Sequence, residues 1–261
     1  MTTKTTKIIL AFGVFTSLLL MLNITRRKKN QSVQAKYTTA DTAIILVDLQ
    51  NDFTEANDGT LAVRGGTGTK QAYLDEVSKA QKFLYHRGFF TVATKDWHPQ
   101  DHASFASNHV DVEEYGEIKY DNGKHGTAWP DHCVQGTRGA AIVDQLKGLY
   151  HEEVHKGMDK TCECYSGFGN DNGKETELLR LLKNREGAKI ANLIVFGLAT
   201  DYCVKCTALD GKKAGYNVIV VEDLCRAVDL NGSLEEAKKK MGEAGISFIN
   251  FAALKKEILG T

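Results

Sequence analysis

The sequence has little proline, few tryptophans and no excess of either charge, and these scarcities exclude several classes of protein. Only two prolines and two tryptophans occur among 261 residues. With no low-complexity segment either, the chain is neither collagen-like nor disordered. Lys plus Arg and Asp plus Glu both number 33, so the formal net charge is zero. We therefore expect no nucleic-acid partner that relies on overall basicity.

What is present is the composition of a globular protein, with 42% hydrophobic and 25% charged residues. The length is that of one large or two small domains.

Positive charge is concentrated at the N-terminus. Residues 1–36 contain seven basic side chains and no acidic one, so the rest of the chain has seven more acids than bases. Within this N-terminal segment of residues 1–36, residues 8–24 are apolar and uncharged. As a helix this run would be about 25 Å long, close to the ~30 Å of a bilayer core.

Two interpretations of the N-terminal segment stay open. As a single-pass signal anchor it remains in the membrane, and as a signal peptide it is cleaved and the protein is secreted. The basic run 26–29 follows the apolar residues directly and resists translocation, which favours an anchor with the body on the cytosolic side. We expect residues 1–36 to form this anchor or signal plus a basic linker, and residues 37–261 to form the folded domain.

The six cysteines are unevenly spaced, and a domain of this length buries a core without disulfide staples. We therefore expect most of them to be reduced. Cys162 and Cys164 could bind a metal, but no second pair lies at zinc-finger spacing.

Short apolar runs alternate with segments of helical periodicity along the body of the chain. Strands are predicted at 42–47, 89–94, 192–196 and 217–221, and less clearly at 153–155 and 246–250. Helices are predicted at 69–87, 140–147, 174–185, 202–214 and 234–243. Gly88 and Gly215 follow two of these helices as C-caps would. The alternation predicts an α/β fold, a doubly wound three-layer sandwich with a mostly parallel sheet, preceded by an N-terminal apolar helix. Its site is expected at the C-terminal ends of the strands.

Two short segments, 94–102 and 129–133, hold every proline and tryptophan of the chain together with histidine and aspartate. Asp96 and His98 are one residue apart, so on an extended segment their side chains point the same way. His132 lies in the second segment. Asp with two His is a ligand set found on Zn²⁺, Fe²⁺ or Mn²⁺ with positions left open. The alternative is that these histidines only form hydrogen bonds in loops.

Cys203 follows a predicted strand and turn and opens a predicted helix. The partial positive charge at a helix N-terminus stabilises a thiolate, and a strand–turn–helix elbow exposes a nucleophile above an α/β sheet. The alternative is a buried structural cysteine. A thiol nucleophile needs a base and a positive neighbour. Asp48 is a candidate base because it follows the first strand, whereas spacing alone does not select the cation among 33 basic residues.

Together these stretches resemble the nicotinamidase branch of the isochorismatase-like cysteine hydrolases. The matching segments run in family order over residues 42–250. They are LVDLQNDF (46–53), LAVRGG (61–66), ATKDWHPQDHASF (93–105), WPDHCVQGT (129–137), HKGMD (155–159), YSGF (165–168), GLATDYCVKCTALD (197–210) and VVEDLCRAV (220–228). The resemblance implies an isochorismatase-like hydrolase domain over 37–261. It also implies an amidohydrolase that converts nicotinamide to nicotinate and ammonia through a cysteine thioester, within NAD salvage.

The resemblance also implies roles for individual residues. The catalytic triad would be Asp48, Lys156 and Cys203. The oxyanion hole would be the backbone N–H groups of Ala199 and Cys203, beside a cis peptide between Leu198 and Ala199. One divalent metal ion, zinc before iron or manganese, would be held by Asp96, His98 and His132, with His102 ranked lower as a further ligand. The pyridine ring would be bordered by Phe53, Trp97 and Tyr165.

The chain departs from the family pattern in its N-terminal segment, in the Cys162–Cys164 pair, and in the charged stretch 108–125, which we expect to be a lid loop. Two other functions stay open. One is an amidohydrolase acting on a ureido or carbamoyl compound, and metal-free enzymes of that kind would not need Asp96 and the two histidines. The other is a catalytically silent scaffold tethered to a membrane, which would not need the triad. We also expect a homo-oligomer.

Overall fold

The computed structural model describes residues 34–261. The predicted N-terminal apolar helix and the basic run lie outside these residues, and both stay predictions. Within the described part of the chain, no helix combines the length and the apolar character needed to cross a membrane.

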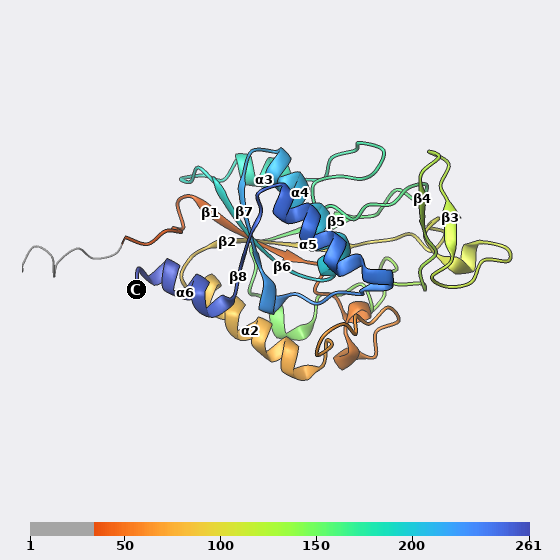
Figure 1. The fold of residues 1–261 in the computed structure, drawn as a ribbon, viewed down its shortest axis with the longest axis horizontal. Helices are drawn as coiled ribbons and strands as arrows, with labels where there is room; N and C mark the ends of the chain where they lie inside the picture. Colours follow the sequence, from red (N-terminus) through yellow and green to blue (C-terminus); the bar gives the residue numbers. More distant parts are fainter. Residues whose placement is uncertain (1–33) are drawn as a thin grey trace, which may run out of the picture.

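Six parallel strands form the central sheet, in the order β5-β2-β1-β6-β7-β8 (Figure 1). Their bounds are β1 Thr42–Val47, β2 Phe90–Asp96, β5 Glu152–Lys156, β6 Asn192–Gly197, β7 Asn217–Val221 and β8 Ser247–Ile249. The chain builds outward from β1 to β5 and then returns to add β6, β7 and β8 on the other side. The direction of winding therefore switches between β1 and β6, and a crevice at the carboxyl ends of these strands is the usual ligand site of such a fold.

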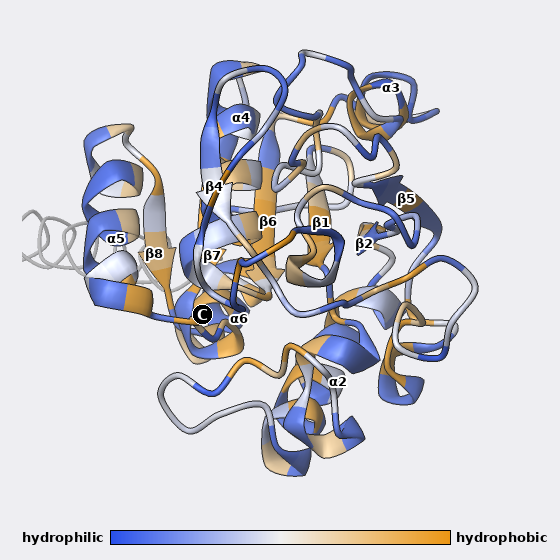
Figure 2. Cartoon of the chain, turned by 90° about the vertical axis from the view of Figure 1, so that its right-hand side faces the viewer, coloured by the Kyte–Doolittle hydropathy of each residue, from blue (hydrophilic) through white to orange (hydrophobic). Residues whose placement is uncertain are grey.

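Helices cover both faces of the sheet, so the sheet is buried on both sides. Figure 1 shows α2 and α6 on one face and α3, α4 and α5 on the other. Their bounds are α2 Gln71–His86, α3 Leu178–Lys183, α4 Lys205–Lys213, α5 Ser233–Glu243 and α6 Phe251–Leu259. All six residues of β1 are buried, which explains its continuous apolar sequence. Apolar colour accordingly concentrates on strands such as β1 and β6 in Figure 2. The predicted α/β class with a mostly parallel sheet is confirmed.

The predicted helix at 140–147 is wrong, because this segment contains only the 3₁₀ turn Asp144–Leu146. Its backbone instead pairs with the chain after β1: Val143 N–H donates to Leu49 O at 3.0 Å, and Ile142 forms an antiparallel bridge with Gln50. These contacts hold the segment extended.

Two helices also differ from the prediction. The helix predicted at 174–185 is shorter in the structure, where α3 spans Leu178–Lys183. The helix α6 was not predicted, although its side-chain N-cap and its terminal glycine are visible in the sequence.

The charged stretch expected to be a lid loop forms most of a small β-hairpin. Its strands, β3 (Glu117–Lys119) and β4 (His125–Thr127), form a separate two-stranded sheet that stands away from the main sheet in Figure 1. Ile118 and Tyr120 are buried in a small apolar cluster with two alanines. This cluster gives the hairpin a core of its own.

Gly197, at the end of β6, allows β1 and β6 to approach closely. Its φ is +133°, and a Cβ built on it would lie 2.1 Å from the carbonyl oxygen of Val47. We predict that Gly197→Ala lowers the free energy of unfolding by about 3 kcal/mol or more, as expected for a clash added to backbone strain. Gly215→Ala is the control, because Gly215 has a φ of +94° but no atom within 4 Å of its Cβ position. It should cost about 1–2 kcal/mol. Urea denaturation measures both, and equal losses would contradict this account.

Candidate active site

Asp48 and Cys203 lie at the switch point of the sheet, because β1 and β6 end side by side with Val47 opposite Gly197. Asp48 follows β1 directly and has a positive φ of 47°, which turns the chain sharply out of the strand. After β6 comes the Leu198–Ala199 peptide, which is cis as the resemblance implied. Cys203 then lies in a π-helical turn, Thr200–Val204, that leads into α4. The predicted strand–turn–helix elbow is confirmed, with its first turn wider than an α-helix.

Lys156 reaches the same point from the last residue of β5. The register of β2 and β5 places it opposite Asp96, the last residue of β2. Its Nζ lies 2.9 Å from Asp48 Oδ2 and 2.5 Å from Asp96 Oδ1. The same ammonium donates to Cys203 Sγ at 3.4 Å and to the carbonyl of Cys164 at 3.0 Å. The structure thus brings the three triad candidates together around one buried ammonium.

The burial of this cluster determines which groups hold protons. Burial raises the pKa of the Cys203 thiol well above its ordinary value, and Lys156 only partly opposes the rise. Burial also raises the pKa of Asp48, again against the influence of Lys156. Burial alone would lower the pKa of Lys156, but the carboxylates of Asp48 and Asp96 raise it. The resting cysteine is therefore a neutral thiol, in contrast to the thiolate expected from its position at a helix N-terminus.

Asp48 is placed to take the thiol proton. Its Oδ1 accepts a hydrogen bond from Thr94 Oγ1 at 2.6 Å, which orients the carboxylate. Its Oδ2 forms the ion pair with Lys156 but has no hydrogen-bonding partner of regular geometry within residues 34–261. Ligand atoms of Asp48, Asp96 and Cys203 all lie within 4.8 Å of one another. Proton transfer from sulfur to Asp48 therefore needs little movement.

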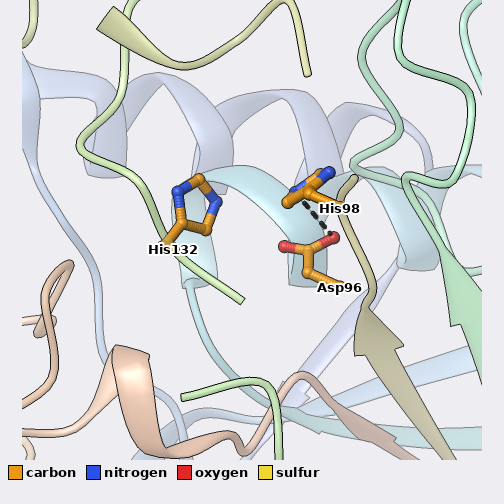
Figure 3. Close-up of side chains that lie close together, drawn as sticks. All are labelled: Asp96, His98 and His132. Atoms are coloured by element: carbon orange, nitrogen blue, oxygen red, sulfur yellow. Dashed lines mark ion pairs between the residues drawn. The ribbon is translucent and has the colours of Figure 1, made fainter. Parts of the chain in front are cut away.

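Asp96, His98 and His132 converge beside the triad (Figure 3), with one ligand atom of each within 4.8 Å of the others. His98 Nδ1 lies 2.9 Å from the carbonyl of Gly157, and His132 Nδ1 lies 2.7 Å from that of Pro130. Each ring can thus donate through Nδ1, which is how proteins orient metal-binding histidines. The other nitrogen of His98, Nε2, lies 3.6 Å from Asp96 Oδ1 (Figure 3). Burial, followed by the charge of His98, lowers the pKa of His132 to about 4, so its imidazole is neutral. This donor set fits a divalent metal ion.

His102 is buried near these ligands but does not join them. Its ring lies 4.2 Å from that of His98, yet it is not part of the convergent group. Its Nδ1 lies 2.7 Å from Ser104 Oγ and 3.1 Å from the backbone nitrogen of Ser104. The Nε2 atom has no partner among the described residues. The structure therefore brings Asp96, His98 and His132 together as candidate ligands and leaves His102 outside this group.

A cavity opens above Cys203 and contains most of the predicted substrate contacts. Phe53, Tyr165, Ala199 and Cys203 all line it. Trp97 is absent from its wall: its ring stacks on His155 at 4.8 Å and 14°. Side chains alternate along an extended segment, so a residue between Asp96 and His98 points away from the site that those two share.

Trp129 supplies an aromatic wall that sequence analysis did not assign. It lines the cavity, and its indole N–H donates to the Tyr165 hydroxyl at 3.1 Å. Its position three residues before His132 could have indicated, from the sequence, that it lies near the site. The cavity also includes Glu163, which no sequence pattern indicated. The remaining unassigned lining residues are Leu61, Val63, Tyr202 and Val228.

All six cysteines are free, as expected. Cys162 and Cys164 are buried, and neither belongs to a cluster of potential metal ligands in the described part of the chain. The structure therefore gives no support to a second metal site at this pair.

The comparison with known protein families agrees with this fold and this geometry. The model of the isochorismatase domain matches residues 42–250, so the chain belongs to the isochorismatase family. Within that family it is 41% identical to the nicotinamidase of Escherichia coli over 218 residues, which cover 80% of this chain and 95% of the relative.

Two solved structures extend the comparison. The Acinetobacter baumannii nicotinamidase/pyrazinamidase has 36% sequence identity and a TM-score of 0.73, over 82% of this chain and 98% of its own. The Pyrococcus horikoshii pyrazinamidase in complex with zinc has 30% identity and a TM-score of 0.63, over 80% of this chain and 99% of its own.

We predict that His98→Ala and His132→Ala lose bound divalent metal, while His102→Ala keeps it. Loss of a direct ligand should weaken affinity by more than the ~10–100-fold typical of outer-shell changes, and loss of His102 by less than about tenfold. Elemental analysis after dialysis against a metal buffer measures the difference. Equal metal content in all three variants would refute the ligand assignment.

Proposed function

We propose that this protein is a nicotinamidase, which hydrolyses nicotinamide to nicotinate and ammonia within NAD salvage. The observation that carries the proposal is the convergence of Asp48 and Lys156 with Cys203, which lines an aromatic-walled cavity. The nicotinamidases among its relatives support the choice of substrate. A ureido or carbamoyl substrate is not favoured by these relatives, and a silent scaffold would not need the assembled triad.

In the proposed reaction Asp48 takes the proton of the Cys203 thiol, and the sulfur attacks the carboxamide carbon. The developing oxyanion is stabilised by the backbone N–H groups of Ala199 and Cys203, where one such donor contributes about 3–4 kcal/mol in other acyl transferases. Asp48 returns the proton to the departing nitrogen, so ammonia leaves and a thioester remains. Water, deprotonated by the same carboxylate, then releases nicotinate and the thiol.

The lining of the cavity suits a flat heteroaromatic ring. Phe53, Trp129 and Tyr165 supply apolar ring surface, and tilted or edge-on contacts between aromatic rings are favourable. A divalent cation on Asp96, His98 and His132, when bound, supplies a Lewis acid that fixes the ring in orientation. We propose zinc as this cation, because a carboxylate and two imidazoles with open positions form a common catalytic zinc site and the Pyrococcus relative was solved with zinc.

We further propose that residues 1–36 act as a single-pass N-terminal anchor, with secretion after signal cleavage as the alternative. The support is the apolar run 8–24 followed directly by basic residues. A membrane contact through this run and a homo-oligomeric assembly both stay predictions from the sequence.

Replacing the nucleophile tests the proposed function most simply. We predict that Cys203→Ala lowers the kcat for ammonia release from nicotinamide by at least about 10³-fold, as loss of a nucleophile does in triad enzymes. Cys206→Ala is the matched control, because Cys206 is a neighbouring cysteine that does not line the cavity, and it should stay within about threefold of the native kcat. A native protein that is metal-loaded and releases no ammonia would refute the function.

The raised pKa of Asp48 predicts the acid limb of the pH profile. A protonated Asp48 cannot accept the thiol proton, so kcat/KM should fall as the pH drops through this pKa. The midpoint should lie above the ~3.9 of an ordinary aspartate. Steady-state assays across pH in a constant-ionic-strength buffer, on protein shown to stay folded, measure this midpoint. A flat profile down to pH 4 would argue against Asp48 as the base.

A further inference from the structure

Glu163 is a buried carboxylate that the proposed reaction does not use. Only 5% of the residue is exposed, and its side chain lines the same cavity as Cys203 and His132. A buried carboxylate beside a reacting centre is costly unless its charge is compensated, so its presence calls for a role.

Two donors hold this carboxylate in place. Glu163 Oε1 accepts the backbone N–H of Cys164 at 3.0 Å, and Oε2 accepts the hydroxyl of Tyr120 at 3.3 Å. Tyr120 is 4% exposed and belongs to the turn between β3 and β4. Burial, followed by the charge of Glu163, raises the pKa of Tyr120, so the hydroxyl keeps its proton and remains a donor.

The hairpin that carries Tyr120 is fixed to the same segment as Glu163. Lys124 Nζ lies 3.2 Å from Asp171 Oδ1, and the backbone N–H of Asp171 donates to the carbonyl of Glu163 at 3.0 Å. The carboxylate is therefore held by contacts on both its side chain and its backbone. A fixed charge on the cavity wall is suited to discrimination between ligands.

The negative charge of Glu163 changes the net charge of the ionisable groups in and around the cavity. Asp48, Asp96 and Glu163 are acidic and Lys156 is basic. Histidines that bind a metal are neutral, so in the metal-binding form these groups carry a net charge of −2 before the cation is counted. A bound divalent cation would bring the total to zero. Without Glu163 the loaded site would be positive by one unit, and a positive site of low dielectric would hold an anion tightly.

We propose that Glu163 is a selectivity residue whose negative charge weakens the binding of the anionic product while leaving the neutral amide almost unaffected. This inference rests on the proposed function, in which a neutral carboxamide becomes a carboxylate of the same shape. The positioned charge thereby promotes product release. Tyr120 acts through Glu163 as a positioning residue.

The test compares two ligands of similar size, nicotinate as the anion and 3-acetylpyridine as the neutral control. Isothermal titration calorimetry gives the Kd of each for the full chain at equal metal content. In Glu163→Gln the Kd for nicotinate should fall by about tenfold, as for one unit charge acting over roughly 10 Å at an effective dielectric constant of about 20. The Kd for 3-acetylpyridine should stay within about twofold.

Charge-conserving variants separate charge from structure. Glu163→Asp and Tyr120→Phe both keep the negative charge, so nicotinate should bind each of them less tightly than it binds Glu163→Gln. If the two ligands change affinity together in Glu163→Gln, the residue is merely structural and the inference fails. The same holds if neither affinity changes.

Steady-state assays separate this failure from failure of the proposed function. If the native protein releases ammonia from nicotinamide but the two Kd values move together, only the selectivity inference falls. If no ammonia is released, the proposed function falls, while the Kd ratio still reports whether Glu163 discriminates by charge.

Discussion

The active site depends on one interaction, the burial of the Lys156 ammonium between two carboxylates and a thiol. Removing three charged groups from water is costly, and mutual attraction repays the cost only when each group has a partner. Lys156 lies 2.9 Å from Asp48 Oδ2 and 3.4 Å from Cys203 Sγ, and Asp96 completes its surroundings. The ammonium therefore couples Asp48 and Cys203 to the proposed metal ligands, because Asp96 is both a partner of Lys156 and a member of that ligand set.

The sheet topology makes this coupling available. The carboxyl ends of β5, β2, β1 and β6 are neighbours in the strand order, and each of them delivers one functional side chain or the loop that carries it. The winding order places the switch point between β1 and β6, where the crevice forms. A rigid parallel sheet holds these ends in register, which supports the preorganised geometry that acyl transfer needs.

Much of this arrangement could be predicted from the sequence, and the errors have physical causes. The apolar strands 42–47 and 217–221 were predicted with the observed bounds because buried parallel strands read as continuous β-branched runs. Lys156 could not be selected from spacing, because its partner Asp96 is set by the pairing of β5 with β2. Trp97 was assigned by resemblance, against the alternation that turns it away. The segment 140–147 has helical periodicity, but tertiary pairing keeps it extended, and Glu163 has no local signal at all.

The central claim is that the sulfur held beside this ammonium is the atom that attacks the substrate. Acid quenching during turnover, followed by mass spectrometry of the peptides, tests it most directly. The account predicts a nicotinoyl thioester on the peptide containing Cys203 in the native protein, and none in Lys156→Met. Ammonia release with no adduct on Cys203, or with an adduct on another cysteine, would contradict it.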